Sequence, residues 1–108
     1  MVDGGRRVQA FSIDHVCSEC GAVPDVIKID VEGAELSVLR GARETIAAAG
    51  DRLTLFVEMH PELWREAGYG LRDVQVECEQ LGLEPQSICS GDRWGTDGVC
   101  VMLRQKGR

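Results

Sequence analysis

The twelve residues from Pro24 to Glu35, PDVIKIDVEGAE, join a run of mainly β-branched residues to an acidic turn and then to a helical pattern. In an α/β protein such a junction lies at the carboxyl end of a strand, where ligands bind opposite a helix N-terminus. The carboxylates of Asp30, Glu32 and Glu35 fall within six residues, which is more acid than a structural turn requires. The segment therefore predicts an α/β fold and the position of its functional site.

Strand-like and helix-like patterns alternate along the chain. Apolar or alternating runs predict strands at residues 8–13, 26–31, 53–59, 85–89 and 99–103. Helical spacing predicts a short helix at 15–20 capped by Asp14, a longer one between Gly33 and Gly50, and a third at 71–81 ended by Gly82. This order predicts a parallel sheet whose last two strands form an antiparallel hairpin at one edge.

The helix between Gly33 and Gly50 has the clearest apolar face. This face consists of Leu36, Leu39, Ala42 and Ile46. Glu35 lies four residues before Leu39, so the sequence places a carboxylate on the face that should pack against the sheet.

The composition limits the classes of partner. With 108 residues the chain is one domain or part of one, and a net charge of −6 provides no basic face for nucleic acid or an anionic membrane. The chain has no apolar run long enough to cross a bilayer. The first seven residues, MVDGGRR, lack the apolar core of a signal peptide, which predicts a cytoplasmic protein.

The five cysteines do not form a metal-binding pattern. Only Cys17 and Cys20 have ligand-like spacing, and no second pair or histidine cluster completes a zinc site. A redox-active pair is the alternative, but no thioredoxin-like context surrounds it. We expect reduced thiols that pack as small hydrophobic side chains.

Acidic residues and a histidine are expected to meet at one edge of the sheet. If residues 26–31 and 53–59 form parallel strands, their carboxyl ends place Asp30 and Glu32 near Glu58 and His60. This set of side chains can provide a general base, a metal site, or hydrogen-bond acceptors for a polar or cationic ligand.

Structural explanations also exist for these residues. The acidic residues can interact with the positive end of the following helix, each contributing about 0.3–1 kcal/mol. Lys28 can pair with Asp30, and Glu58 can pair with Arg52 or Arg65. Each explanation accounts for one residue, whereas the convergence of the whole set favours a site.

Three further features have two interpretations each. Gly33 either admits a ligand close to the backbone or eases the turn between strand and helix. His60, before Pro61, is either part of the site or a loop residue without a role. The segment 90–98 is either a plain hairpin connection, which we favour, or a lid in which Trp94 stacks on a substrate.

The extended motif resembles the signature of FkbM-type methyltransferases. The motif PDVIKIDVEGAE continues into VLRGA at residues 38–42, is preceded by FSIDHV at 11–16, and is followed by LFVEMHP at 55–61. These features occur in the family's order, and the resemblance covers residues 8–61 well and the rest by general pattern only. It implies an S-adenosylmethionine-dependent enzyme that methylates a hydroxyl oxygen on a small molecule or sugar.

The resemblance also implies a fold and roles for individual residues. The fold is a Rossmann-like methyltransferase sheet with a terminal antiparallel hairpin. Asp30, Glu58 and His60 become the catalytic residues, with Asp30 near the reacting methyl or the hydroxyl and His60 or Glu58 as proton acceptor. Asp30, Glu32 and Gly33 become cofactor contacts. A metal held by the catalytic residues is the less favoured variant.

The family's main cofactor motif is absent from the sequence. That motif is an Asp-x-Gly-Ala-Asn-x-Gly loop followed by a strand ending in Glu-Pro, and Gly4-Gly5 cannot replace it. We therefore expect residues 1–108 to form a single partial domain, the C-terminal portion of the sheet, with an open strand edge. Truncation, a split gene or a miscalled start would each produce such a chain, and with a split gene the N-terminal half would lie on another polypeptide. The alternative is a non-catalytic α/β remnant or interaction module that does not bind the cofactor.

Overall fold

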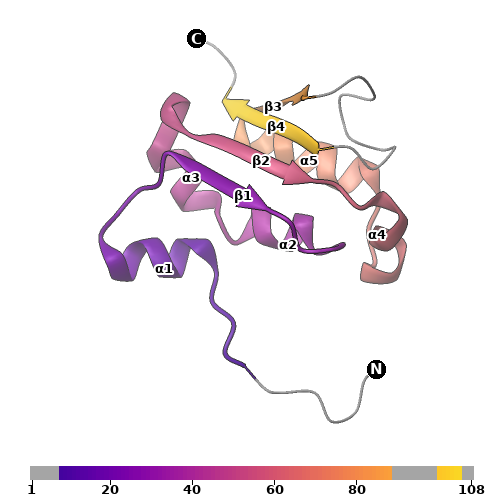
Figure 1. Cartoon of the computed structure of the whole chain (residues 1–108), viewed down its shortest axis with the longest axis horizontal. Helices are drawn as coiled ribbons and strands as arrows, with labels where there is room; N and C mark the ends of the chain where they lie inside the picture. Colours follow the sequence, from indigo (N-terminus) through magenta and orange to yellow (C-terminus); the bar gives the residue numbers. More distant parts are fainter. Residues whose placement is uncertain (1–7, 89–99, 106–108) are drawn as a thin grey trace.

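A single sheet with helices packed against one face organises the chain (Figure 1). The computed structural model describes residues 8–88 and 100–105. The elements are, in chain order, α1 (Ile13–Cys20), β1 (Val26–Ile29), α2 (Glu35–Arg40), α3 (Arg43–Ala49), the 3₁₀ turn η1 (Gly50–Arg52), β2 (Thr54–Glu58), α4 (Pro61–Ala67), α5 (Leu71–Leu81), β3 (Leu83–Ser87) and β4 (Cys100–Gln105). The architecture is mixed α/β, as the sequence predicts.

The sheet has the strand order β1-β2-β4-β3. β1 and β2 are parallel, while β4 runs antiparallel to both β2 and β3. The predicted antiparallel hairpin at one edge is therefore confirmed. At the other edge β1 pairs only with β2 within the described residues, so the expected open strand edge is present. The arrangement is consistent with part of a methyltransferase fold.

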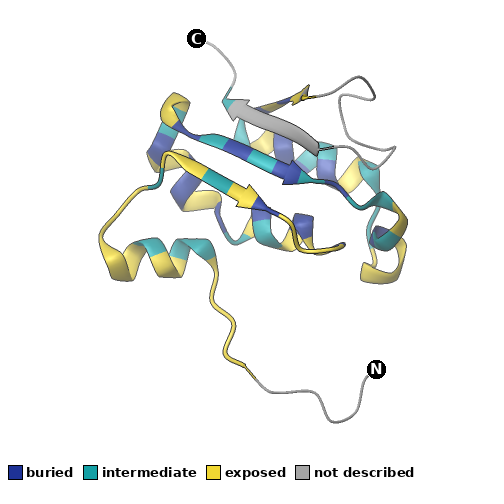
Figure 2. Cartoon of the chain, viewed as in Figure 1, coloured by how far each residue is buried: buried dark blue, intermediate teal, exposed yellow. Residues whose placement is uncertain are grey.

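The hydrophobic core lies between the sheet and helices α2, α3 and α5 (Figures 1 and 2). Leu55 and Val57 of β2 are fully buried on this side, whereas Phe56 between them is only half-buried. Within the described residues no helix covers the opposite face, and Val26 of β1 is 61% exposed. The sheet is thus covered on one side, which leaves its carboxyl edge accessible.

The prediction of a strand at residues 8–13 is wrong. Residues 8–12 have no regular structure, and α1 already begins at Ile13. The Ser12 hydroxyl accepts a hydrogen bond from the His15 amide at 3.0 Å, so Ser12 caps α1 instead of Asp14. A local hydrogen bond satisfies the backbone here, and residues 8–12 pair with no strand in the part of the chain that the structure describes.

The predicted helix between Gly33 and Gly50 is split into α2 and α3. The Gly41 carbonyl accepts a hydrogen bond from the Asp14 amide at 2.8 Å, which takes it out of the helical pattern. The Asp14 carboxylate accepts bonds from the amides of Glu44 and Thr45 and from the Thr45 hydroxyl. Burial acts to raise the pKa of Asp14, but these hydrogen bonds outweigh it and hold the pKa below its ordinary value of 3.8. Asp14 therefore caps α3 across a long sequence separation.

Helix α4 is absent from the sequence prediction. It begins at Pro61, a residue favoured in the first helical turn, and ends at Gly68, which has φ +90°. The helix is short, and Trp64 is its only buried residue. Its apolar face is therefore too small to produce a periodic pattern.

The prediction for the cysteines holds only in part. Cys17, Cys20 and Cys78 are free thiols. Cys78 packs in the core, and burial raises its pKa to about 12. Cys20 is exposed, so it does not pack as a hydrophobic side chain. The loop at 90–98, with Trp94 and its two interpretations, lies outside the described residues.

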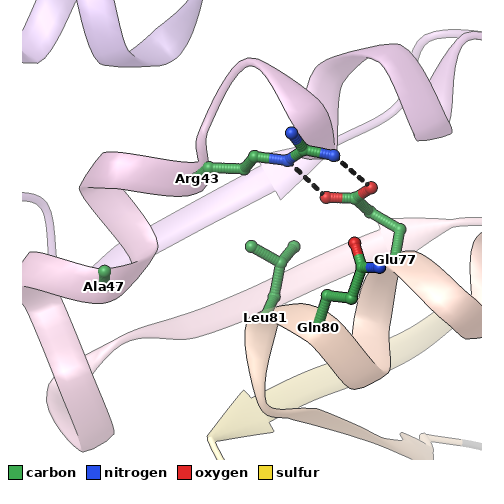
Figure 3. Close-up of a pocket in the computed structure, with 5 residues that line it drawn as sticks. All are labelled: Arg43, Ala47, Glu77, Gln80 and Leu81. Atoms are coloured by element: carbon green, nitrogen blue, oxygen red, sulfur yellow. Dashed lines mark hydrogen bonds and ion pairs between the residues drawn. The ribbon is translucent and has the colours of Figure 1, made fainter.

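A pocket between α3 and α5 is lined by an ion pair between the exposed Arg43 and the buried Glu77 (Figure 3). Arg43 Nε and Nη2 donate to the two carboxylate oxygens of Glu77, each at 2.8 Å. Arg40 Nε lies 3.5 Å from the same carboxylate, whose side chain is only 3% exposed. This pairing explains why a charged residue lies on the packed side of α5.

Replacing Glu77 with glutamine is expected to reduce the free energy of unfolding by about 1–2 kcal/mol at neutral pH. Hydrogen bonds from Arg43 hold the pKa of Glu77 below its ordinary value of 4.5. The carboxylate therefore contributes its full stabilisation above pH 4.5 and loses it as the pH falls through the lower folded-state pKa. Urea denaturation of both proteins should show a difference at neutral pH that shrinks towards about pH 3. Glu79→Gln, at an exposed position of the same helix, is the control, and a pH-independent difference would contradict the explanation.

Candidate functional site

Two carboxylates and an imidazole meet at the carboxyl ends of β1 and β2. The parallel register pairs Ile29 with Val57, so the next residues, Asp30 and Glu58, emerge at the same edge. His60 Nε2 lies 3.9 Å from Asp30 Oδ1 and 3.9 Å from Glu58 Oε1. One potential ligand atom from each of these three residues lies within 4.8 Å of the others. The predicted convergence is confirmed for these residues, which we call the edge cluster.

The ion-pair alternatives for the edge cluster are not realised. Among the described residues, Lys28 forms no ion pair with Asp30, and neither Arg52 nor Arg65 pairs with Glu58. The side chain of Asp30 is 46% exposed and that of Glu58 is 38% exposed, whereas His60 is 16% exposed. The carboxylates therefore face solvent, and the imidazole lies behind them.

The turn between β1 and α2 has unusual backbone angles. Glu32 has φ +46° and Gly33 has φ +104°, and the Ala34 amide donates to the Val31 carbonyl at 3.4 Å. Two positive φ angles at the centre are characteristic of a type I′ turn, and the left-handed conformation is strained for Glu32. The Glu32 side chain is exposed and outside the edge cluster. Local strain of this kind is often found at functional sites.

Gly33 is required by the packing of the turn. A Cβ atom at this position would lie 2.8 Å from Leu63 Cβ. The Gly33 amide donates to Glu35 Oε2, and its carbonyl accepts from the Tyr69 hydroxyl. Both backbone groups are bound within the protein, so the turn alone accounts for the glycine. A cofactor contact by Gly33 stays a prediction.

Glu35 is the residue of this region that the sequence prediction underestimated. Its side chain is fully buried, and Oε1 accepts hydrogen bonds from the His60 amide and from Trp64 Nε1, each at 2.9 Å. Oε2 accepts the Gly33 amide at 2.6 Å and lies 3.6 Å from His60 Nδ1. One carboxylate thus joins the turn, the end of β2 and helix α4. The available signal was the acid on an apolar helix face, but the sequence could not identify its partners.

Two aromatic side chains cover this buried carboxylate. The rings of Trp64 and Tyr69 are stacked with centroids 5.8 Å apart. The Tyr69 hydroxyl donates to the Gly33 carbonyl and accepts the Leu36 amide at 3.4 Å. Burial raises the pKa of Tyr69, so the hydroxyl keeps its proton and its donor role. These aromatic residues exclude water from the inner side of His60.

The edge cluster is equipped for chemistry that needs electron-pair donors. A neutral imidazole beside accessible carboxylates can accept a proton or bind a hydroxyl or a cationic group. The same donor set is used for divalent cations in other proteins. Among the described residues, no Lys or Arg forms an ion pair with the edge cluster. The negative charge of its carboxylates can therefore bind a ligand that carries a positive charge or a hydroxyl proton.

Comparison with known protein families identifies the chain at this point. The methyltransferase FkbM domain matches residues 2–85, which include β1, β2 and the edge cluster. The chain belongs to the FkbM methyltransferase family. No curated protein and no solved structure matches it.

The family match extends beyond the region covered by the sequence resemblance. It includes α5 and the start of β3, which the motifs at residues 8–61 did not reach. Membership of the FkbM family implies methyltransferase chemistry and, in general, a cofactor of the S-adenosylmethionine type. Among the described residues no helix is long and apolar enough to cross a membrane.

Proposed function

We propose that this chain supplies the acceptor side of an S-adenosylmethionine-dependent O-methyl transfer to a hydroxyl on a small molecule or sugar. The observation that supports this most strongly is the convergence of His60 Nε2 with Asp30 and Glu58 in a member of a methyltransferase family. The cofactor supplies an electrophilic methyl carbon, whose bond to sulfur breaks with the electron pair going to sulfur as the bond to oxygen forms. The protein must align the hydroxyl and remove its proton.

In this proposal His60 Nε2 is the proton acceptor. It faces Asp30 and Glu58 at the edge of the sheet, and the His60 side chain is only 16% exposed. A positioned imidazole can accept a hydroxyl proton with its lone pair, forming the new N–H bond. Asp30 then orients the hydroxyl, and the negative charges of Asp30 and Glu58 stabilise the imidazolium that forms.

The exposed carboxylates of Asp30 and Glu32 are the proposed cofactor contacts. S-adenosylmethionine carries a sulfonium and an ammonium group, to which carboxylates are complementary, and its ribose hydroxyls can donate to them. Asp30 and Glu32 are both exposed at the end of β1, so they are accessible to such a ligand. The glycine-rich part of the cofactor site, on this proposal, is provided by a separate segment or polypeptide.

Titration calorimetry with S-adenosylmethionine tests the cofactor contact. The chain is expected to bind the compound with a Kd of about 1 mM or tighter, and Asp30→Asn is expected to weaken binding about tenfold, or about 1.4 kcal/mol. The physical reason is that the amide removes a charge-assisted contact with a cationic group.

Glu62→Gln is the matched control, because Glu62 is an exposed acid on α4 outside the edge cluster. Equal affinities for wild type and Asp30→Asn would exclude Asp30 as a cofactor contact. No binding heat for the chain alone, but activity restored by an N-terminal partner, would support a split enzyme. No binding heat and no restored activity would contradict the proposal and favour the second candidate function.

The second candidate is an interaction module without catalytic activity. Its supporting observation is the open edge of β1 beside exposed apolar residues, with Val23 at 45%, Val26 at 61% and Val31 at 39% exposure. An unpaired strand edge offers backbone donors and acceptors to a strand of another chain. A polypeptide carrying the missing half of the methyltransferase sheet would satisfy both candidates, because it would complete the sheet and the cofactor site together.

A further inference from the structure

His60 lies between one buried carboxylate and two accessible ones. On the inner side, Nδ1 is 3.6 Å from Glu35 Oε2. On the outer side, Nε2 is 3.9 Å from an oxygen of Asp30 and 3.9 Å from one of Glu58. The two ring nitrogens therefore have different surroundings, and the inner carboxylate has no place in the chemistry described so far.

The Glu35 carboxylate is held in a fixed orientation. Its side chain is fully buried, and it accepts hydrogen bonds from two backbone amides and the Trp64 indole. One of these amides belongs to His60 itself, at 2.9 Å. The same carboxylate thus binds the backbone of the histidine and faces its ring. Because every one of these bonds requires an acceptor, the carboxylate is suited to its ionised form.

His60 Nδ1 is shielded from solvent and has no hydrogen-bond partner within the described residues. A buried polar nitrogen without a partner is unfavourable, and Glu35 Oε2 is the facing oxygen that can satisfy it. A proton on Nδ1 would be attracted by this carboxylate, whereas a lone pair on Nδ1 would be repelled. Asp30 and Glu58 act on Nε2 in the same way, but they are farther away at 3.9 Å and their exposed charges are screened by solvent, whereas Glu35 is closer and fully buried. The separation of 3.6 Å is longer than a hydrogen bond, so Glu35 acts on Nδ1 through its charge in this arrangement.

We infer that Glu35 is a positioning residue that keeps the proton of neutral His60 on Nδ1 and directs the Nε2 lone pair towards Asp30 and Glu58. Its catalytic consequence rests on the proposed function. With Nδ1 protonated, Nε2 is free to accept the hydroxyl proton, and the imidazolium formed is held between carboxylates on both sides. With the opposite tautomer, Nε2 carries a proton and cannot act as the base.

The tautomer can be measured directly in the full chain by two-bond ¹H–¹⁵N correlation spectra of the histidine rings at a pH where both are neutral. His60 is expected to show a protonated Nδ1 and an unprotonated Nε2. His15, which is exposed on α1, provides an internal reference that should show the Nε2-protonated form preferred by free imidazole. A His60 spectrum with the proton on Nε2 would overturn the inference without any variant.

Glu35→Gln is expected to shift His60 to the Nε2-protonated form, because an amide N–H facing Nδ1 favours a lone pair there. Trp64→Phe is the matched control, since it removes a donor to Glu35 but keeps the carboxylate. The control should retain the wild-type tautomer. An unchanged His60 spectrum in folded Glu35→Gln would also overturn the inference, and if that variant does not fold, the wild-type spectrum still decides.

The methyl-transfer assay separates this inference from the proposed function. Glu35→Gln is expected to lower kcat about 100-fold, the lower end of the contribution of a general base, while KM changes little. A fixed Nδ1-protonated tautomer without methyl transfer would refute the proposed function and leave the positioning role intact. Methyl transfer with His60 protonated on Nε2 would refute the positioning role of Glu35 and leave methyl transfer as the function.

Discussion

Replacing Gly33 with alanine is expected to reduce the free energy of unfolding by about 2–5 kcal/mol. The backbone at Gly33 has φ +104°, a conformation that L side chains rarely adopt. The new Cβ would also lie 2.8 Å from Leu63 Cβ, so α4 would have to move away from the turn. Urea denaturation followed by circular dichroism measures the loss.

Gly68→Ala is the matched control for this prediction. Gly68 has φ +90° at the end of α4, but a Cβ there would have no atom within 4 Å. Alanine at Gly68 should therefore show backbone strain alone, about 1–2 kcal/mol. If both variants were destabilised equally, the contact with Leu63 would not be a determinant of the turn.

Glu35→Ala is expected to have the second large effect, a loss of about 3–5 kcal/mol. The substitution leaves three donors, the amides of Gly33 and His60 and the Trp64 indole, without their acceptor in a region closed to water. Since domains of this size are stable by roughly 5–15 kcal/mol, the variant should be close to unfolding at ambient temperature. Thermal and urea denaturation measure this directly.

The control for Glu35→Ala is Glu66→Ala, which removes an exposed carboxylate from α4. Exposed substitutions of this kind typically change stability by less than about 0.5 kcal/mol. A Glu35→Ala protein as stable as the control would mean that water replaces the lost acceptor, and the buried carboxylate would then be unimportant for the fold. Glu35 thus has a structural role, tested here, and a positioning role, tested through the His60 tautomer.

The pairing of β1 with β2 was predictable because apolar patterning in these segments is strong. Residues 26–31 and 53–59 were expected as strands, and the structure has Val26–Ile29 and Thr54–Glu58. Once two parallel strands are neighbours, the residues after their ends must lie at one edge. The meeting of Asp30, Glu58 and His60 follows from this rule, so the sequence was sufficient for the edge cluster.

Elements that depend on distant contacts were not predictable. The break between α2 and α3 arises because the Asp14 amide donates to the Gly41 carbonyl. The Asp14 carboxylate, from the same distant part of the chain, accepts hydrogen bonds from the Glu44 and Thr45 amides. The segment 8–13 has the alternation of a strand, but a strand forms only where another strand can pair with it. In the first case tertiary hydrogen bonds override the local helical preference, and in the second the expected strand does not form.

The sequence by itself determined the α/β class, the position of the acidic strand-to-helix turn and the family to which the chain belongs. Periodicity and strand order indicate the fold class and the position of the turn, because they reflect which residues must be buried together. The family follows from the extended motif and the family match. The arrangement of Glu35 behind His60 was decided only by the tertiary structure. In the sequence Glu35 is one acidic residue on an apolar helix face. Its role follows from the hydrogen bonds that it accepts from the Gly33 amide, the His60 amide and the Trp64 indole, which belong to separate elements. A buried charge is stable only with such partners, and the chain brings them together only when it folds.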